Sequence, residues 1–238
     1  MSRWIEHVKK YARDNCTTYS RALKESRKSY NAQPTKGGSL SSTSLKGLLE
    51  ASYDGRPSVG DFKIDKSLST VNTKVYHDSK TGQTVVAHKG TVGASDWLNN
   101  ATYALGGRQA YKMTTRYRDA EKVQRKAEAR YGKKTITTIG HSQGGLQAEL
   151  LGSDTKETIT LDKATRPFGN KRSKNQIDIS SKTDVVSSLN PFQKSNKKEI
   201  TIKSNTLNPV SSHDIGQLDK LGDSMIGKGC CNRRNCRF

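Results

Sequence analysis

The sequence predicts an α/β fold with a mostly parallel central sheet, preceded by a small basic helical hairpin. Segments rich in β-branched residues are typical of strands, and they occur at 135–139, 157–161, 176–180 and 199–203. Helical patterns at 108–131 and 144–151 alternate with these strands. Such alternation implies parallel strands with helices packed against the sheet. Apolar residues make up only 31% of the chain, so we expect a modest core with basic segments attached to it.

The first thirty residues are predicted to form two short helices. Apolar residues recur at helical spacing in the first helix, at Trp4, Ile5, Val8 and Tyr11. Thr18 is a suitable N-cap for the second helix, which would carry Ala22, Leu23 and Tyr30 on one face. Residues 1–30 resemble a short helical module at the N-termini of proteins of large DNA viruses. The other interpretation is a basic hairpin that docks on the body of the protein or on a partner.

Composition divides the rest of the chain into a linker, a body and a tail. Gly, Ser, Pro and Thr dominate residues 31–43, which is typical of a flexible linker. The body spans 44–224 and begins with a short helix at 44–53. Within it, strands at 73–77 and 84–88 flank a turn and predict a β-hairpin. Residues 225–238 form a basic tail with three cysteines and no apolar period.

The charge balance favours a polyanionic partner. The chain has 42 Lys and Arg against 22 Asp and Glu, a net charge of +20, which suits nucleic acid or an anionic membrane surface. A solvated basic surface without a partner is the alternative. No run reaches the 18 apolar residues of a membrane span, and the N-terminus lacks the apolar core of a signal peptide. We therefore expect synthesis in the cytoplasm, and neither the His nor the Cys spacing suggests a metal site or a cofactor.

The most informative motif is Gly-x-Ser-x-Gly at residues 140–144. A β-branched strand leads into the motif and a helical pattern follows it, which is the strand–turn–helix of a nucleophile elbow. In such a turn, a side chain at Gly140 or Gly144 would collide with the neighbouring strand or helix. The turn would expose the Ser142 hydroxyl at the positive end of a helix. The alternative is a glycine-rich turn without catalysis.

An elbow serine needs a base and an orienting carboxylate, which follow it in the chain in this order: serine, acid, histidine. His213 is the only histidine after Ser142 and lies in a loop-like setting. His141, inside the elbow, should point away from the base position. The carboxylates between Ser142 and His213 are Glu149, Asp154, Glu157, Asp162, Asp178, Asp184 and Glu199. We choose Asp184, just past a predicted strand, with Asp178 as the second candidate.

Three segments resemble the class 3 (fungal-type) lipases of the α/β-hydrolase superfamily over roughly residues 60–220. Residues 85–91, Val-Val-Ala-His-Lys-Gly-Thr, are similar to the family's Val-Val-Ala-Phe-Arg-Gly-Thr, and residues 140–145 match its elbow. Asp184-Val185-Val186 resembles the family's acid motif, and His213 stands where its histidine belongs. The resemblance implies an α/β-hydrolase fold and a Ser142, Asp184, His213 triad. It also implies an oxyanion hole from the backbone N–H groups of Gln143 and Thr91.

The segment after Thr91 is a candidate lid. In the lipases that the chain resembles, this region begins the cover over the acyl pocket, and here Trp97, Leu98 and Leu105 could form its apolar face. A capped helix whose apolar residues pack on the core is an equal alternative.

Together these features predict a serine carboxylic-ester hydrolase, a lipase or esterase that acts on lipid esters without a cofactor. The alternative is a catalytically inactive hydrolase scaffold used as a basic, polyanion-binding structural protein of a virus particle. A third interpretation joins the two: a lipase that its basic segments bring to a membrane or a genome. An inactive scaffold has no reason to keep Ser142, Asp184 and His213 in order.

Overall fold

The computed structural model describes seven stretches of the chain: residues 3–26, 39–91, 111–164, 173–181, 199–203, 213–223 and 225–226. The lid candidates Trp97, Leu98 and Leu105 lie outside the described residues, as does the predicted acid Asp184. The oxyanion candidates, the elbow and His213 lie within them.

The central sheet has eight strands whose spatial order follows the chain. They are β2 (Ser58–Val59), β3 (Phe62–Ile64), β4 (Thr73–Asp78), β5 (Gln83–His88), β6 (Ile136–His141), β7 (Glu157–Leu161), β8 (Gln176–Ser181) and β9 (Glu199–Ile202). β2 to β5 pair antiparallel, and β5 to β9 pair parallel. The α/β fold with a mostly parallel sheet is therefore confirmed, and so is the predicted hairpin, which β4 and β5 form.

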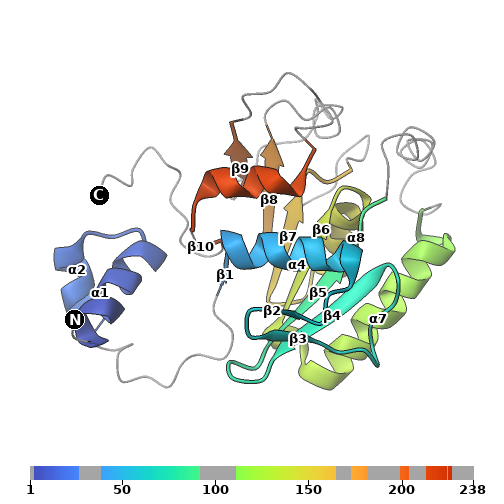
Figure 1. The fold of residues 1–238 in the computed structure, drawn as a ribbon, viewed down its shortest axis with the longest axis horizontal. Helices are drawn as coiled ribbons and strands as arrows, with labels where there is room; N and C mark the ends of the chain where they lie inside the picture. Colours follow the sequence, from blue (N-terminus) through green and yellow to red (C-terminus); the bar gives the residue numbers. More distant parts are fainter. Residues whose placement is uncertain are drawn as a thin grey trace.

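Helices cover both faces of this sheet (Figure 1). α4 (Ser42–Asp54) and the 3₁₀ helix η2 (Ile215–Leu221) pack side by side on one face. α7 (Thr115–Tyr131) and α8 (Gln143–Leu151) pack on the other face, and the 3₁₀ turn η1 (Lys133–Thr135) leads into β6. Adjacent parallel strands are joined by crossover connections, which run over one face of the sheet. α7 lies in the connection from β5 to β6, and α8 lies in the connection from β6 to β7.

The alternation of side chains along the strands divides the apolar core into two layers. Val85 and Ala87 of β5 join the cluster that contains Leu45 and Leu49 of α4. Val86, between them, joins the smaller cluster with Val123 of α7. Successive strand residues point to opposite faces, so β5 is buried on both sides. Such burial keeps the strand ends, where the candidate site lies, in fixed positions.

The N-terminal residues form the two predicted helices, α1 (Arg3–Asp14) and α2 (Tyr19–Glu25). The Thr18 hydroxyl accepts a hydrogen bond from the Arg21 N–H, as expected for an N-cap. A small cluster of Val8, Ala12 and Ala22 joins the helices. Leu23 is exposed instead of sharing the buried face with Ala22, because adjacent residues of a helix point in directions about 100° apart.

Two boundaries differ from the sequence prediction. α7 begins at Thr115 rather than 108, because the Thr114 side chain caps the helix by accepting the Tyr117 N–H. Met113, just before this cap, is 69% exposed. In addition, β1 (Leu40–Ser41) pairs antiparallel with β10 (Met225–Ile226). The predicted linker and the predicted tail thus each contribute two residues to a small sheet, in which Leu40 and Ile226 are buried.

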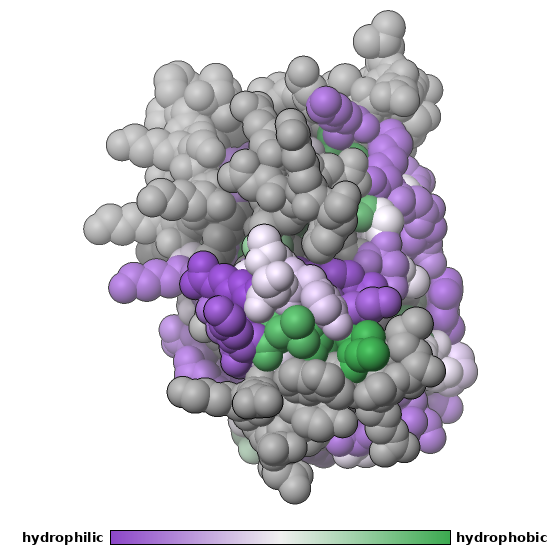
Figure 2. All heavy atoms as spheres, turned by 90° about the vertical axis from the view of Figure 1, so that its left-hand side faces the viewer, coloured by the Kyte–Doolittle hydropathy of each residue, from purple (hydrophilic) through white to green (hydrophobic). Residues whose placement is uncertain are grey.

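The described surface is mainly hydrophilic. On the face drawn in Figure 2, polar side chains predominate among the coloured residues, and apolar groups reach the surface in small areas only. The exposed large apolar residues of the described part are Tyr19, Leu23, Val71 and Met113. Among the described residues, no helix is both long enough and apolar enough to cross a membrane.

Candidate active site

Ser142 lies in the predicted strand–turn–helix, between β6 and α8. Its backbone has φ 56° and ψ −125°, a conformation that a non-glycine residue rarely adopts. The Ser142 N–H donates to the Leu161 carbonyl at 3.0 Å, and the Ser142 carbonyl accepts from the Ala164 N–H at 3.0 Å. These two bonds join the turn to the end of β7 and hold the strained serine in place.

The glycines around Ser142 are required by close backbone contacts. A Cβ at Gly140 would lie 2.1 Å from the Gly144 carbonyl oxygen, and a Cβ at Gly144 would lie 2.1 Å from the His88 carbonyl oxygen. Both distances are impossible for a real side chain, and both obstacles are backbone atoms. The collision expected from the sequence at these two positions is therefore confirmed. Because Gly144 has no side chain, the start of α8 can pack directly against the end of β5.

The two residues predicted to supply the oxyanion hole lie side by side. The Thr91 hydroxyl donates to the Gln143 side-chain oxygen at 2.8 Å. Gln143 is the first residue of α8, where backbone N–H groups have no partner within the helix. Arg116, in the first turn of α7, donates to the carbonyl oxygens of Lys89 and Gly90, the latter at 3.0 Å. The Arg116 guanidinium group therefore holds the backbone of the loop that carries Thr91.

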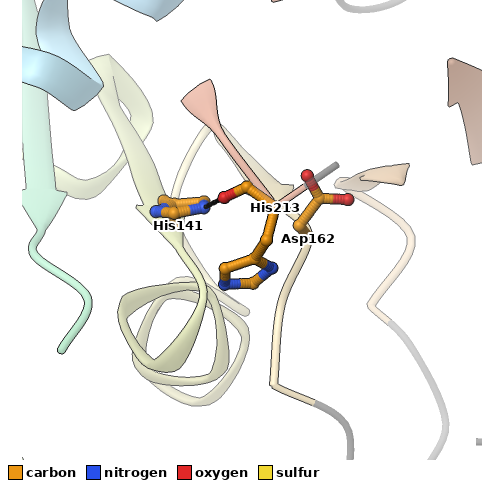
Figure 3. Close-up of side chains that lie close together, drawn as sticks. All are labelled: His141, Asp162 and His213. Atoms are coloured by element: carbon orange, nitrogen blue, oxygen red, sulfur yellow. Dashed lines mark hydrogen bonds between the residues drawn. The ribbon is translucent and has the colours of Figure 1, made fainter. Parts of the chain in front are cut away.

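His213 lies beside His141, the last residue of β6 (Figure 3). Its ring and that of His141 are 4.8 Å apart between centroids, and the His141 Nε2 is 3.0 Å from the His213 carbonyl oxygen. The expectation that His141 points away from the base position is therefore wrong. The elbow backbone turns this side chain toward the segment of His213, and only 7% of His141 is exposed.

Tyr53, near the end of α4, contacts the second ring nitrogen of His141. Its hydroxyl lies 2.8 Å from the His141 Nδ1 and accepts the Gly90 N–H at 3.0 Å. Burial raises the pKa of Tyr53 to about 12, although the Gly90 N–H and the charge of Arg116 act in the opposite direction. The hydroxyl therefore keeps its proton at neutral pH. Sequence reasoning missed Tyr53, because a tyrosine at the end of an apolar helix is ordinary and carries no signal of its own.

Asp162 is a described carboxylate that lies close to both of these histidines. One carboxylate oxygen of Asp162 and one ring nitrogen each of His141 and His213 lie within 4.8 Å of one another (Figure 3). Asp162 is fully buried, has a left-handed φ of 42°, and directly follows β7. Its two carboxylate oxygens accept from the Ser181 N–H at 2.7 Å and the Ser181 hydroxyl at 3.1 Å. Because its oxygens and the His141 nitrogens are hydrogen-bonded, we interpret the group as a hydrogen-bonded cluster rather than a cation site.

Asp178, the second candidate for the acid, takes part in a different network. Its Oδ1 accepts from the Lys163 ammonium at 2.9 Å, from the Thr160 hydroxyl at 2.6 Å and from Gln176. Lys163 also donates to Glu149 at 2.6 Å. Lys163 and Asp178 are buried, so these bonds offset the cost of removing their charges from water. The network joins α8 to the sheet and accounts for Asp178 and Glu149 without a catalytic role.

Acid is expected to destabilise the protein in part through His88, at the end of β5. Burial lowers the pKa of His88 to about 3, with a smaller contribution from Arg116, while a hydrogen bond to Gln124 acts in the opposite direction. An unfolded histidine titrates near 6.5. Between about pH 6.5 and pH 3 the unfolded state therefore binds more protons than the folded state. The free energy of unfolding should fall as the pH drops through this window, by up to about 1.4 kcal/mol per pH unit from this residue.

Chemical unfolding at pH 7 and at pH 4.5 measures this effect, with His88→Phe as the comparison. Phenylalanine stands at this place in the lipase segment that residues 85–91 resemble, and it cannot titrate. We expect the wild-type protein to lose more stability than the variant between the two pH values. Equal losses would contradict a buried, neutral His88.

The comparison with family models identifies a phospholipase-like domain in this chain. A family model described as "Phospholipase-like: Tle-like phospholipase domain" matches residues 24–159, just over half of the 238-residue chain. The match includes Ser142 and Thr91 and ends before His213. No curated protein matches the chain.

Three solved structures, two of them of proteins named as lipases, resemble the chain at 14% sequence identity. The Lip2 lipase from Yarrowia lipolytica has a TM-score of 0.46, with 80% of this chain and 93% of that chain covered. A triacylglycerol lipase from Penicillium expansum has a TM-score of 0.43, with 79% and 88% covered. A mutant form of MDLA from Penicillium cyclopium has a TM-score of 0.41, with 70% and 78% covered.

Proposed function

The chain belongs to the family of Tle-like phospholipase domains, and we propose that it is a serine hydrolase that cleaves carboxylic esters of lipids. The observation that carries the proposal is the backbone of Ser142. A buried serine with φ 56° stands between a strand and a helix, with glycines on either side that no other residue can replace. Strain of this kind persists only where the surrounding structure enforces it, and in a nucleophile elbow it presents the hydroxyl for attack.

In the proposed reaction, the Ser142 hydroxyl oxygen attacks the ester carbonyl carbon while His213 takes the hydroxyl proton. The carbonyl oxygen becomes an oxyanion, which the backbone N–H groups of Gln143 and Thr91 stabilise. The bond to the alcohol then breaks, and His213 returns the proton to the leaving oxygen. Water, deprotonated by His213, attacks the acyl-serine. The bond from the acyl carbon to the Ser142 oxygen then breaks, His213 returns its proton to that oxygen, and the carboxylic acid is released. The side-by-side position of Thr91 and Gln143 supports this assignment of the oxyanion hole.

Asp184 is proposed to orient His213 and to stabilise its charged form. The support for Asp184 is its place in the sequence, a few residues past β8 and within a segment that resembles the acid motif of class 3 lipases. Of the two carboxylates that the structure describes in detail, Asp178 binds Lys163, whereas Asp162 accepts from Ser181 and also lies within 4.8 Å of a ring nitrogen of His213. Trp97, Leu98 and Leu105 are proposed to line a lid over the acyl site, on the same resemblance.

The basic segments are proposed to bring the enzyme to an anionic surface. Lys9, Lys10, Arg13, Arg21 and Lys24 are all exposed on the helical hairpin of α1 and α2, and the net charge of the chain is +20. An anionic membrane would present both a polyanion and an ester substrate. An inactive scaffold that binds nucleic acid in a virus particle is not favoured, because the family match covers the elbow and the oxyanion loop.

Hydrolysis of two substrate series by the purified chain tests the proposed function. The first series is p-nitrophenyl esters of short and long acyl chains, and the second is phospholipid vesicles with and without anionic headgroups. We expect turnover of esters and faster release of fatty acid from anionic vesicles. A folded protein that hydrolyses neither series, under conditions where a known lipase does, would contradict the proposal.

A further inference from the structure

A chain of hydrogen bonds joins the three segments on which the proposed reaction depends. The Gly90 N–H, in the loop before Thr91, donates to the Tyr53 hydroxyl at 3.0 Å. That hydroxyl lies 2.8 Å from Nδ1 of His141, the residue before Ser142. Nε2 of His141 lies 3.0 Å from the carbonyl oxygen of His213. One tyrosine and one histidine thus connect the oxyanion loop, the elbow and the backbone of the base.

The direction of each bond follows from the groups at the two ends. The His213 carbonyl can only accept, so Nε2 of His141 must carry the proton that lies between them. In a neutral imidazole, Nδ1 is then an acceptor. The Tyr53 hydroxyl accepts the Gly90 N–H and is left to donate its own proton to Nδ1. Every donor has an acceptor in this arrangement, which fixes one tautomer and one ring orientation for His141.

Close packing leaves these groups little freedom to move. A Cβ at Gly90 would lie 2.4 Å from the Tyr53 hydroxyl and 2.8 Å from the His141 carbonyl oxygen, so the loop can approach both residues only as glycine. The Arg116 guanidinium binds the Gly90 carbonyl from the other side. The loop is therefore held at both its N–H and its C=O group, one residue before Thr91.

We infer that Tyr53 and His141 are positioning residues that hold the oxyanion loop and His213 in register with Ser142. The inference rests on the proposed function and adds to it two residues that do not touch the reacting atoms. Catalysis depends on this register because a displacement of about 1 Å can cost on the order of 100-fold in rate. Loss of either link should therefore lower kcat and leave substrate binding, and hence KM, nearly unchanged.

Tyr53→Phe tests the first link, because it removes one hydroxyl and keeps the ring. Tyr76→Phe is a control with the same chemical change: Tyr76 is fully buried where Tyr53 is half-buried, and the Tyr76 hydroxyl binds the carbonyl oxygens of Ala51 and Arg56, outside the chain of bonds. We expect Tyr53→Phe to lower kcat by about 10- to 100-fold with KM unchanged, and Tyr76→Phe to keep the wild-type kcat. Equal kcat values for the two variants would overturn the inference.

His141→Gln and His141→Leu test the second link. A glutamine side chain can place an N–H near the position of Nε2, whereas leucine cannot, so glutamine should recover part of the kcat that leucine loses. The imidazole ¹⁵N signals of His141 provide a readout that needs no turnover. They should report the neutral Nε2–H tautomer at pH 7 in the wild-type protein and a change in Tyr53→Phe.

The two readouts separate the failure of this inference from the failure of the proposed function. Turnover in the wild-type protein together with the Nδ1–H tautomer or a charged His141 would overturn the inference and leave the proposed function standing. Absence of wild-type turnover would instead contradict the proposed function. In that case the ¹⁵N signals alone decide whether Tyr53 and His141 hold the arrangement described.

Discussion

Ser142→Ala and His213→Gln are each expected to lower kcat for ester hydrolysis by about 10⁶-fold, and the double variant is expected to be no slower than either single variant. The two side chains act as one unit, because the serine is a weak nucleophile without the base and the base has no proton to take without the serine. The oxyanion hole and substrate binding remain in both variants and should leave a residual rate above that of water.

Steady-state kinetics of the three variants measure this coupling. Ser67→Ala and His77→Gln are matched controls, because Ser67 is an exposed residue bonded to Asp65, and His77 stacks on Tyr131 away from the elbow. Both controls should keep the wild-type rate. Losses that multiply in the double variant would show that the two residues act independently, and this would contradict a serine–histidine pair.

Asp184→Asn is expected to lower kcat by about 10⁴-fold, because asparagine favours the wrong tautomer of the histidine it contacts. Asp162→Asn is expected to have a much smaller effect on kcat and a larger effect on stability. The Asp162 carboxylate accepts both the N–H and the hydroxyl of Ser181, and through them it joins the end of β7 to the end of β8. An asparagine can accept with only one of its two terminal atoms.

The two aspartates should therefore separate in a plot of kcat against the free energy of unfolding. Asp184→Asn should fall low in kcat at nearly wild-type stability, and Asp162→Asn should show the reverse. If Asp162→Asn instead shows the larger loss of kcat, the assignment of Asp184 as the acid is wrong, and Asp162 is the residue that orients His213.

Most of the sheet could be predicted from local patterns. The strands β6, β7, β8 and β9 are short β-branched segments, and their bounds in the structure differ by at most two residues from those expected. The elbow could be predicted because its geometry depends on a few consecutive residues. Gly140 and Gly144 are needed where two backbones meet within 2.1 Å of an added Cβ, and such a requirement leaves a direct trace in the sequence.

Features that depend on contacts between distant segments could not be predicted in this way. β1 and β10 contribute two residues each, and their pairing joins positions 40 and 226. Such a short strand has no periodicity of its own. The orientation of His141 depends equally on Tyr53, far earlier in the chain, and on the backbone of His213. The sequence motif contains His141 but does not indicate which way its ring turns.

The position of Asp162 beside the histidines is another feature that depends on contacts between distant segments. It is one of seven carboxylates between Ser142 and His213, and its burial, left-handed backbone and position beside the histidines depend on the pairing of β6, β7 and β8. A rule about position in the chain cannot rank such residues. Only the spatial order of the strands brings Asp162 next to the elbow.

Covalent labelling by a fluorophosphonate, followed by mass spectrometry of the digested protein, tests the central claim most directly. The reagent reacts with a serine that a nearby base activates, and it requires no knowledge of the substrate. We expect a single stoichiometric adduct on Ser142, lost in Ser142→Ala and strongly slowed in His213→Gln. A folded protein that is not labelled, or is labelled at another serine, would contradict Ser142 as the nucleophile.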